Sequence, residues 1–195
     1  MATVPSVGKD GSGNNNNWTP VNINSTTVGP TYDLMTDVPT ITNATTANYC
    51  TLNPLAKATN QTISDGNLTS VDAGSNGKVL GTLGVSSGKY YWEITPYSGV
   101  YQMIGVALTT SPTNKYPGED ANSWSWYQGN GGVKINNGVQ TSYATFTNND
   151  VIGVALDLDG GTLTFYKNNT SQGVAFSSLP SGTYTPTIAV SYTHL

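Results

Sequence analysis

From Tyr49 onward the chain consists of short segments in which apolar and polar residues alternate, and no helical period lasts longer than one turn. Turn sequences separate these segments: Asp65-Gly66, Asn136-Asn137-Gly138 and Leu158–Gly161 each join two of them as in a β-hairpin. About eleven short strands at this spacing predict an all-β fold, an antiparallel β-sandwich of two sheets. Beyond the first hairpin, the expected strands are residues 78–83, 89–95, 101–108, 133–135, 139–140, 151–157, 162–167, 173–176 and 185–190.

The most apolar strands predict the core. Segments such as 151–156 are apolar on both faces, so a second sheet is expected on one face and a long loop or the N-terminal segment on the other. The side chains expected to be buried are Trp92, Ile94, Ile104, Val106, Leu108, Ile152, Val154, Leu156, Leu163 and Phe165.

The sequence predicts one domain with a segment on each side of it. Residues 1–46 are rich in Asn and Gly and are interrupted by prolines, which predicts a connector that precedes the domain or packs on it. Residues 47–190 are expected to form the sandwich, and residues 191–195 a non-native tail.

Composition excludes several functions. Charged residues make up 9% of the chain and none is arginine, which with a net charge of −4 argues against nucleic-acid binding. With one cysteine, Cys50, and one histidine, His194, the chain is expected to have no disulfide framework, no Cys- or His-based metal site and no cofactor. No apolar run reaches the length of a membrane span, so membrane insertion is not expected.

The carboxylates do not predict catalysis. Asp157 and Asp159 lie in an Asp-Leu-Asp-Gly-Gly sequence that favours a turn over a calcium loop, because further ligands at fixed spacing are missing. Glu93 and Glu119 are the only glutamates, and a glycosidase needs two carboxylates facing each other across a cleft. We therefore expect no catalytic residues and no enzyme activity.

Loop residues are the candidates for binding. Trp124 and Trp126 share one strand face and Tyr127 points the other way, so at least one Trp is expected in the core and the other remains a possible sugar platform. The loops 97–101, 113–120 and 128–132 are expected to cluster at one end of the sandwich in a concave surface. The alternative for 113–120 is a solvated loop whose charges keep the protein soluble. The candidate ligand-binding residues are Tyr97, Tyr101, Lys115, Tyr116, Glu119, Asp120 and Asn130.

Four blocks carry a family resemblance: SSGKYYWEIT (86–95), MIGVAL (103–108), NSWSWYQGNGGVKINNG (122–138) and DVIGVALDLDGGTLTFYKNN (150–169). Their order and spacing resemble a SPRY domain, which implies a bent sandwich of the concanavalin A-like kind used for recognition through loops. Residues 49–70 resemble the opening of SPRY domains in tailed-phage proteins. Residues 8–23 and 32–40 are similar to the connectors that precede such domains in phage tail fibres.

The resemblance implies a non-catalytic recognition module of a phage tail fibre or related virion protein. It would act extracellularly, contact other virion proteins and bind a bacterial surface glycan or protein through loops at one end of the sandwich. The alternatives are an architectural virion spacer or assembly domain without a soluble ligand, and a glycan-active enzyme domain.

The end of the chain departs from the family. The sequence VSYTHL (190–195) stands where a closing strand is expected, and it can be read as the translation of a sequencing-library adapter. We therefore expect a truncated environmental sequence in which residues 191–195 form an irregular tail. His194 would make no specific contact, and a strand edge would be left unpaired.

Overall fold

The structure is a computed structural model that describes residues 13–17, 19, 48–72, 77–99, 101–189 and 192–194. The chain divides into two units, Met1–Asn48 and Tyr49–Leu195, and every strand among the described residues belongs to the second unit. Nearly all of the predicted connector (1–46) lies outside the described residues, so its packing on the domain stays a prediction.

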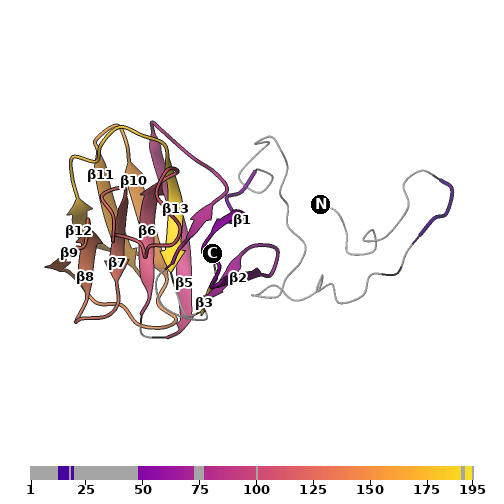
Figure 1. Ribbon diagram of the computed structural model, residues 1–195, viewed down its shortest axis with the longest axis horizontal. Helices are drawn as coiled ribbons and strands as arrows, with labels where there is room; N and C mark the ends of the chain where they lie inside the picture. The colour runs from indigo at the N-terminus through magenta and orange to yellow at the C-terminus, as the bar shows by residue number, and fades with distance from the viewer. Residues whose placement is uncertain are drawn as a thin grey trace. The chain divides into compact units, whose positions relative to one another are not determined.

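The described residues form an all-β fold, as predicted (Figure 1). One seven-stranded sheet has the order β1-β4-β13-β6-β7-β8-β9, and the other has the order β12-β11-β10-β5-β14-β3-β2. We call them the first and the second sheet. No helix within the described residues is long and apolar enough to cross a bilayer. The strands are β1 (Leu52–Lys57), β2 (Gln61–Ser64), β3 (Thr69–Asp72), β4 (Val79–Gly81), β5 (Lys89–Ser98), β6 (Met103–Leu108), β7 (Ser123–Tyr127), β8 (Val133–Asn136), β9 (Val139–Ser142), β10 (Ile152–Asp157), β11 (Thr162–Lys167), β12 (Thr170–Phe176), β13 (Tyr184–Ala189) and β14 (Tyr192–His194).

The three predicted hairpins are confirmed. β2 pairs with β3, β8 with β9 and β10 with β11, all antiparallel. The turn between β8 and β9 has positive φ at both central residues, 52° at Asn137 and 72° at Gly138, as a type I′ turn requires. Asn and Gly tolerate this backbone region better than other residues, which is why the dipeptide marks the hairpin.

The core lies between the two sheets and is close to the predicted one. All of the expected core side chains are buried except Trp92 and Leu108, which are half-buried and pack against the core. Trp124 and Trp126 are both buried, so neither serves as an exposed sugar platform. Trp126 contacts Phe146 and Phe165, with ring centroids 4.8 and 5.5 Å away.

Strand β7 is buried on both faces. Ser123, Ser125 and Tyr127 point away from the core, yet the loop 109–122 covers them. The Ser125 hydroxyl donates to the Pro117 carbonyl at 2.7 Å, and the Gly118 N–H donates to the Ser123 hydroxyl at 2.8 Å. The predicted cover by a long loop is therefore confirmed for the first sheet. On the second sheet, which contains residues 152–157, the outer face keeps an open groove over Ala155.

The predicted irregular C-terminal tail is wrong. Backbone pairing places β14 between β5 and β3: Thr193 lies opposite Pro96 of β5 and Ser70 of β3, and His194 opposite Thr95 and Thr69. The expected open strand edge on β5 is therefore filled at this place. The physical reason is that strand pairing uses backbone N–H and C=O groups, which a segment of almost any sequence can supply. Ser191 and Leu195 lie outside the described residues.

Candidate functional site

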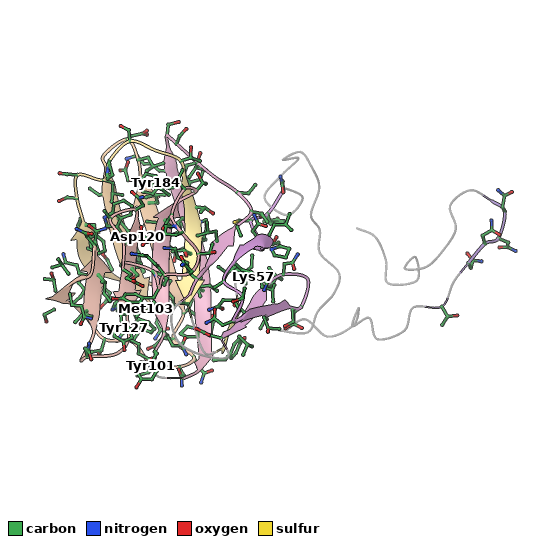
Figure 2. All side chains as sticks on the ribbon, in the orientation of Figure 1. Lys57, Tyr101, Met103, Asp120, Tyr127 and Tyr184 are labelled. Atoms are coloured by element: carbon green, nitrogen blue, oxygen red, sulfur yellow. The ribbon has the colours of Figure 1, made fainter. Side chains whose placement is uncertain are left out.

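Two of the three predicted loops lie at the same end of the sandwich. The strand register places Met103, the first residue of β6, opposite Tyr127, the last residue of β7, and Tyr127 in turn opposite Val133. The loops 99–102 and 128–132 therefore meet at this end. Figure 2 shows Tyr101, Met103 and Tyr127 near one another there, with Tyr184 at the opposite end.

The third predicted loop, 113–120, starts from the opposite end of the sandwich, contrary to the prediction. It connects β6 to β7 where Leu108 lies opposite Tyr184 and Ala107 opposite Ser123. Instead of projecting into solvent, it folds back over the outer face of the first sheet. This brings the half-buried Tyr116 against a cluster made of Tyr127, Val133 and Ile135.

Two predicted aromatic residues thus lie beside a third, Tyr127. We call Tyr101, Met103, Tyr116 and Tyr127 the Tyr127 surface. Tyr101 is 69% exposed, whereas only 6% of Tyr127 is exposed. Burial raises the pKa of Tyr127, and the nearby Tyr101 phenol raises it further, so the two side chains are electrostatic neighbours. Tyr127 was not predicted as a site residue. The available signal in the sequence was its place on the strand face opposite that of Trp124 and Trp126, which marks it as an outward-facing aromatic residue.

Gly129 shapes the loop next to this surface. A Cβ atom at that position would collide with the Tyr127 hydroxyl, so only glycine lets the loop 128–132 lie this close to the ring. Asn130 in the same loop has a positive φ of 57°, and its side-chain amide donates to Gln140 Oε1 at 2.8 Å. Asn130 therefore stabilises the loop while remaining exposed.

The charged loop residues are engaged with one another. Lys115 Nζ lies 3.8 Å from Glu119 Oε1, and the backbone N–H of Tyr116 donates to Glu119 Oε2 at 3.2 Å. Both charged side chains keep solvent-exposed surface, so they remain candidates for ligand contact. Tyr97 is half-buried near the end of β5, which belongs to the second sheet, whereas Tyr127 lies on β7 of the first sheet.

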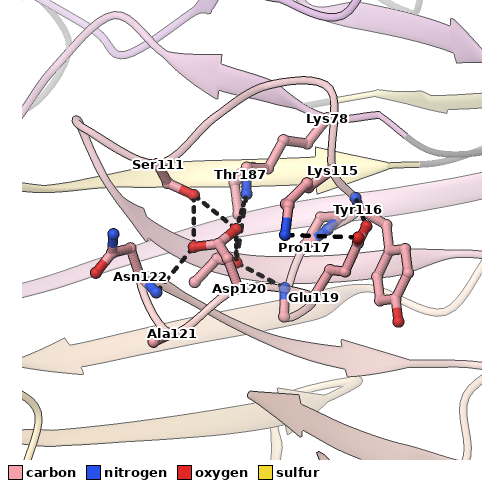
Figure 3. Close-up of polar contacts among 12 residues, drawn as sticks. Lys78, Ser111, Lys115, Tyr116, Pro117, Glu119, Asp120, Ala121, Asn122 and Thr187 are labelled. Atoms are coloured by element: carbon pink, nitrogen blue, oxygen red, sulfur yellow. Dashed lines mark hydrogen bonds and ion pairs between the residues drawn. The ribbon is translucent and has the colours of Figure 1, made fainter. Parts of the chain in front are cut away.

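Asp120 differs from the other candidates because it belongs to a buried polar network (Figure 3). Its Oδ2 lies 2.9 Å from Lys78 Nζ, and its carboxylate accepts hydrogen bonds from the hydroxyls of Ser111 and Ser123 and from the Asn122 N–H. Only 12% of the Asp120 side chain is exposed. Asp120 therefore holds the loop in place and presents little surface to a ligand.

Burial and charge act in opposite directions on this pair. Burial by itself would raise the pKa of Asp120, but the hydrogen bond and positive charge of Lys78 lower the pKa below its ordinary value. Burial lowers the pKa of Lys78, and Asp120 opposes that shift. The backbone N–H of Lys78 also donates to the Thr113 carbonyl at 2.9 Å, so the residue preceding β4 is tied to the loop twice.

The glutamates are not arranged as a catalytic pair. Glu93 is exposed on β5, on the outer face of the second sheet, and accepts the Tyr91 hydroxyl at 2.9 Å. Glu119 lies in the loop that covers the outer face of the first sheet. The sandwich separates these two carboxylates, so they cannot flank one glycosidic bond.

Asp157 and Asp159 form a turn, as predicted. Asp157 Oδ1 accepts the Gly160 N–H at 2.8 Å, and Asp159 Oδ1 accepts the Gly88 N–H at 2.9 Å. Among the residues that the structure describes, no group of three or more His, Cys, Asp or Glu side chains could hold a metal ion.

Comparisons with known proteins identify the family and support the fold. The family model of the SPRY domain matches residues 89–194. Ran-binding protein 9 of Danio rerio is 34% identical over 107 residues, which are 53% of this chain and 18% of that protein. The Ran-binding proteins 9/10 homolog of Drosophila melanogaster is 36% identical over 110 residues, 54% of this chain and 11% of that protein. The matched region thus spans less than a fifth of these relatives' lengths.

A solved structure supports the fold. The SPRY domain of human HERC1 superposes with a TM-score of 0.62 at 20% identity, over 73% of this chain and 95% of that one. The match to the family model covers more than half of the sequence and includes β5, β10 and β11. The chain therefore belongs to the SPRY domain family and carries a protein–protein interaction module.

Proposed function

We propose that this SPRY domain is a non-catalytic recognition module that binds its partner through the Tyr127 surface. The observation that carries the proposal is the position of the exposed Tyr101 beside Tyr127, at the end of the sandwich where two loops meet. Tyrosine offers a large contact area with few rotatable bonds, which suits recognition. The rigid sheet beneath keeps these loops in position.

We further propose that the domain belongs to a phage tail fibre or related virion protein and binds a bacterial surface glycan or protein. This placement rests on the resemblance of residues 8–23 and 32–40 to tail-fibre connectors. The relatives named above are animal proteins, so the shared domain itself does not specify the source. The low content of charged residues favours a partner recognised by hydrogen bonds and ring contacts over one attracted by charge.

An array of bacterial surface polysaccharides and surface proteins tests the proposal. The purified chain is expected to bind at least one member, and Tyr101→Ser is expected to weaken that binding by about tenfold or more. Leu55→Ser is the matched control, because Leu55 is 95% exposed on β1, at the edge of the first sheet away from β7 and β8. Absence of binding to every member would favour the architectural spacer, and turnover of a polysaccharide would favour the enzyme.

A further inference from the structure

The outer face of the second sheet carries a regular arrangement of side chains on β5, β10 and β11. In β10, Ile152, Val154 and Leu156 point into the core, so Gly153, Ala155 and Asp157 point outward. The register then defines three outward rows: Lys89–Asp157–Thr162, Tyr91–Ala155–Thr164 and Glu93–Gly153–Tyr166.

The central strand of this arrangement has the smallest side chains. Ala155 lies between the larger side chains of Tyr91 on β5 and Thr164 on β11, and this difference in size leaves a groove over β10. The groove has a volume of about 380 Å³, and residues of all three strands line it, among them Lys89, Tyr91, Ala155, Asp157, Thr164 and Tyr166. This volume lies at the lower end of the range typical of small-molecule sites.

Tyr91 is exposed and yet held in place. Its side chain is 51% exposed, while its hydroxyl donates to Glu93 Oε1 at 2.9 Å. The Tyr166 ring meets it edge to face, with centroids 5.9 Å apart and an interplanar angle of 83°. A Cβ atom at Gly153 would collide with the Tyr91 ring, so the ring reaches over β10 because that residue is glycine. An aromatic side chain held in this way loses little entropy when a ligand packs on it.

The charges in the groove cancel. Lys89 Nζ lies 2.7 Å from Asp157 Oδ2, so this end of the groove carries an ion pair and no net charge. The backbone of β10 is paired with β5 on one side and β11 on the other, which excludes the addition of a ligand strand to it. A ligand must therefore be recognised by the tyrosine rings, the threonine hydroxyls and the neutralised ion pair.

We propose that this groove is a second binding site and that its ligand is a neutral saccharide. A sugar presents an apolar ring face, which packs against Tyr91, and hydroxyl groups, which pair with Thr164, Asp157 and Lys89. The two charged side chains that line the groove pair with each other, and the Glu93 carboxylate beside Tyr91 would repel an anionic ligand. The site lies on the second sheet, apart from the Tyr127 surface on the first, and the proposal does not depend on the function proposed for that surface.

Titration of the full chain with neutral disaccharides, followed by amide NMR, tests this site. Lactose, maltose, cellobiose and N,N′-diacetylchitobiose serve as probes. At least one is expected to shift the amide signals of Tyr91, Ala155 and Thr164. Tyr91→Ser is expected to weaken that binding by about tenfold, whereas Tyr91→Phe, which keeps the ring, is expected to weaken it only a few-fold.

Two further variants keep the test decisive. Thr164→Val preserves the shape of the side chain but removes its hydroxyl, so it is expected to weaken binding several-fold even if Tyr91→Ser fails to fold. Tyr101→Ser, on the other surface, is expected to leave the disaccharide affinity unchanged. The proposal is overturned if none of the probes shifts these signals, if the shifts occur only around Tyr127, or if only charged sugars or a protein occupy the groove.

Discussion

The ammonium nitrogen of Lys78 lies 2.9 Å from the carboxylate of Asp120, 42 residues away in the sequence, and the Lys78 side chain has no exposed surface. This ion pair joins the residue before β4 to the loop 109–122. The same loop carries Tyr116, which packs beside Tyr127 on the outer face of the first sheet. The buried pair therefore helps to position one of the aromatic residues of the Tyr127 surface.

Lys78→Met is expected to lower the free energy of unfolding by about 3 kcal/mol, because it leaves the Asp120 carboxylate largely buried without its cation. The expected value is at the lower end for buried pairs, since 12% of the Asp120 side chain is exposed. Denaturant unfolding measures the loss. Amide hydrogen exchange in residues 109–122 is expected to become faster, since the loop loses its attachment.

Lys89→Met is the matched control. Lys89 lies 2.7 Å from Asp157, but its side chain is 69% exposed, so solvent already screens the pair. The unfolding midpoint of the Lys89→Met variant is expected to stay close to that of the unchanged chain. An equal loss in both variants would contradict the structural importance assigned to burial of the Lys78–Asp120 pair.

Acid is expected to weaken the same network. Lys78 holds the pKa of Asp120 below its ordinary value, so the unfolded chain binds a proton more readily than the folded chain. The stability from Asp120 is then fully present above the ordinary Asp pKa and is lost as the pH falls through the lower pKa of the folded state. Asp120→Asn should therefore be less stable than the unchanged chain at pH 7, and the difference should shrink toward pH 2. A difference that is independent of pH would contradict this account.

Two buried indole N–H groups, those of Trp92 and Trp126, should differ in what their loss costs. Trp126 Nε1 donates to the Ala144 carbonyl at 2.6 Å, whereas Trp92 Nε1 is buried without a hydrogen-bond partner among the described residues. Trp126→Phe removes a hydrogen bond and is expected to cost about 1–3 kcal/mol more than Trp92→Phe, which relieves an unpaired donor. Parallel denaturant titrations of the two variants measure the difference, and equal costs would contradict it.

Removal of residues 190–195 should expose two strand edges. β14 pairs with β5 on one side and β3 on the other, so its loss leaves backbone groups of both strands without their partners. The melting temperature is expected to fall by several degrees, and the shortened chain is expected to aggregate more readily. An unchanged melting temperature and an unchanged scattering signal would show that β14 contributes nothing to the sheet.

The sequence predicted those parts of the fold that depend on local pattern. The apolar run of β10, the alternation in β11 and the Asn137-Gly138 turn identified strands, hairpins and most of the core. β1 was not predicted because Pro54 interrupts it. Proline is tolerated there because β1 lies at the edge of the first sheet, with an irregular register between Leu52 and Lys57.

The candidate site was only partly predictable. Loop aromatics such as Tyr101 were accessible to local reasoning, because turn residues surround them. The association of Lys78 with Asp120 depends on a contact between distant segments, and no local pattern encodes it. The groove over Ala155 was missed for a related reason: its shape arises from the register of three strands, which the sequence of one strand does not reveal.

Binding of the fluorescently labelled chain to a panel of intact bacterial strains is the most direct test of recognition through the Tyr127 surface. The unchanged chain and Leu55→Ser are expected to label the same strains with equal affinity, whereas Tyr101→Ser is expected to bind them about tenfold more weakly or worse. Equal binding by all three proteins, or no binding to any strain by the unchanged chain, would contradict the proposed function.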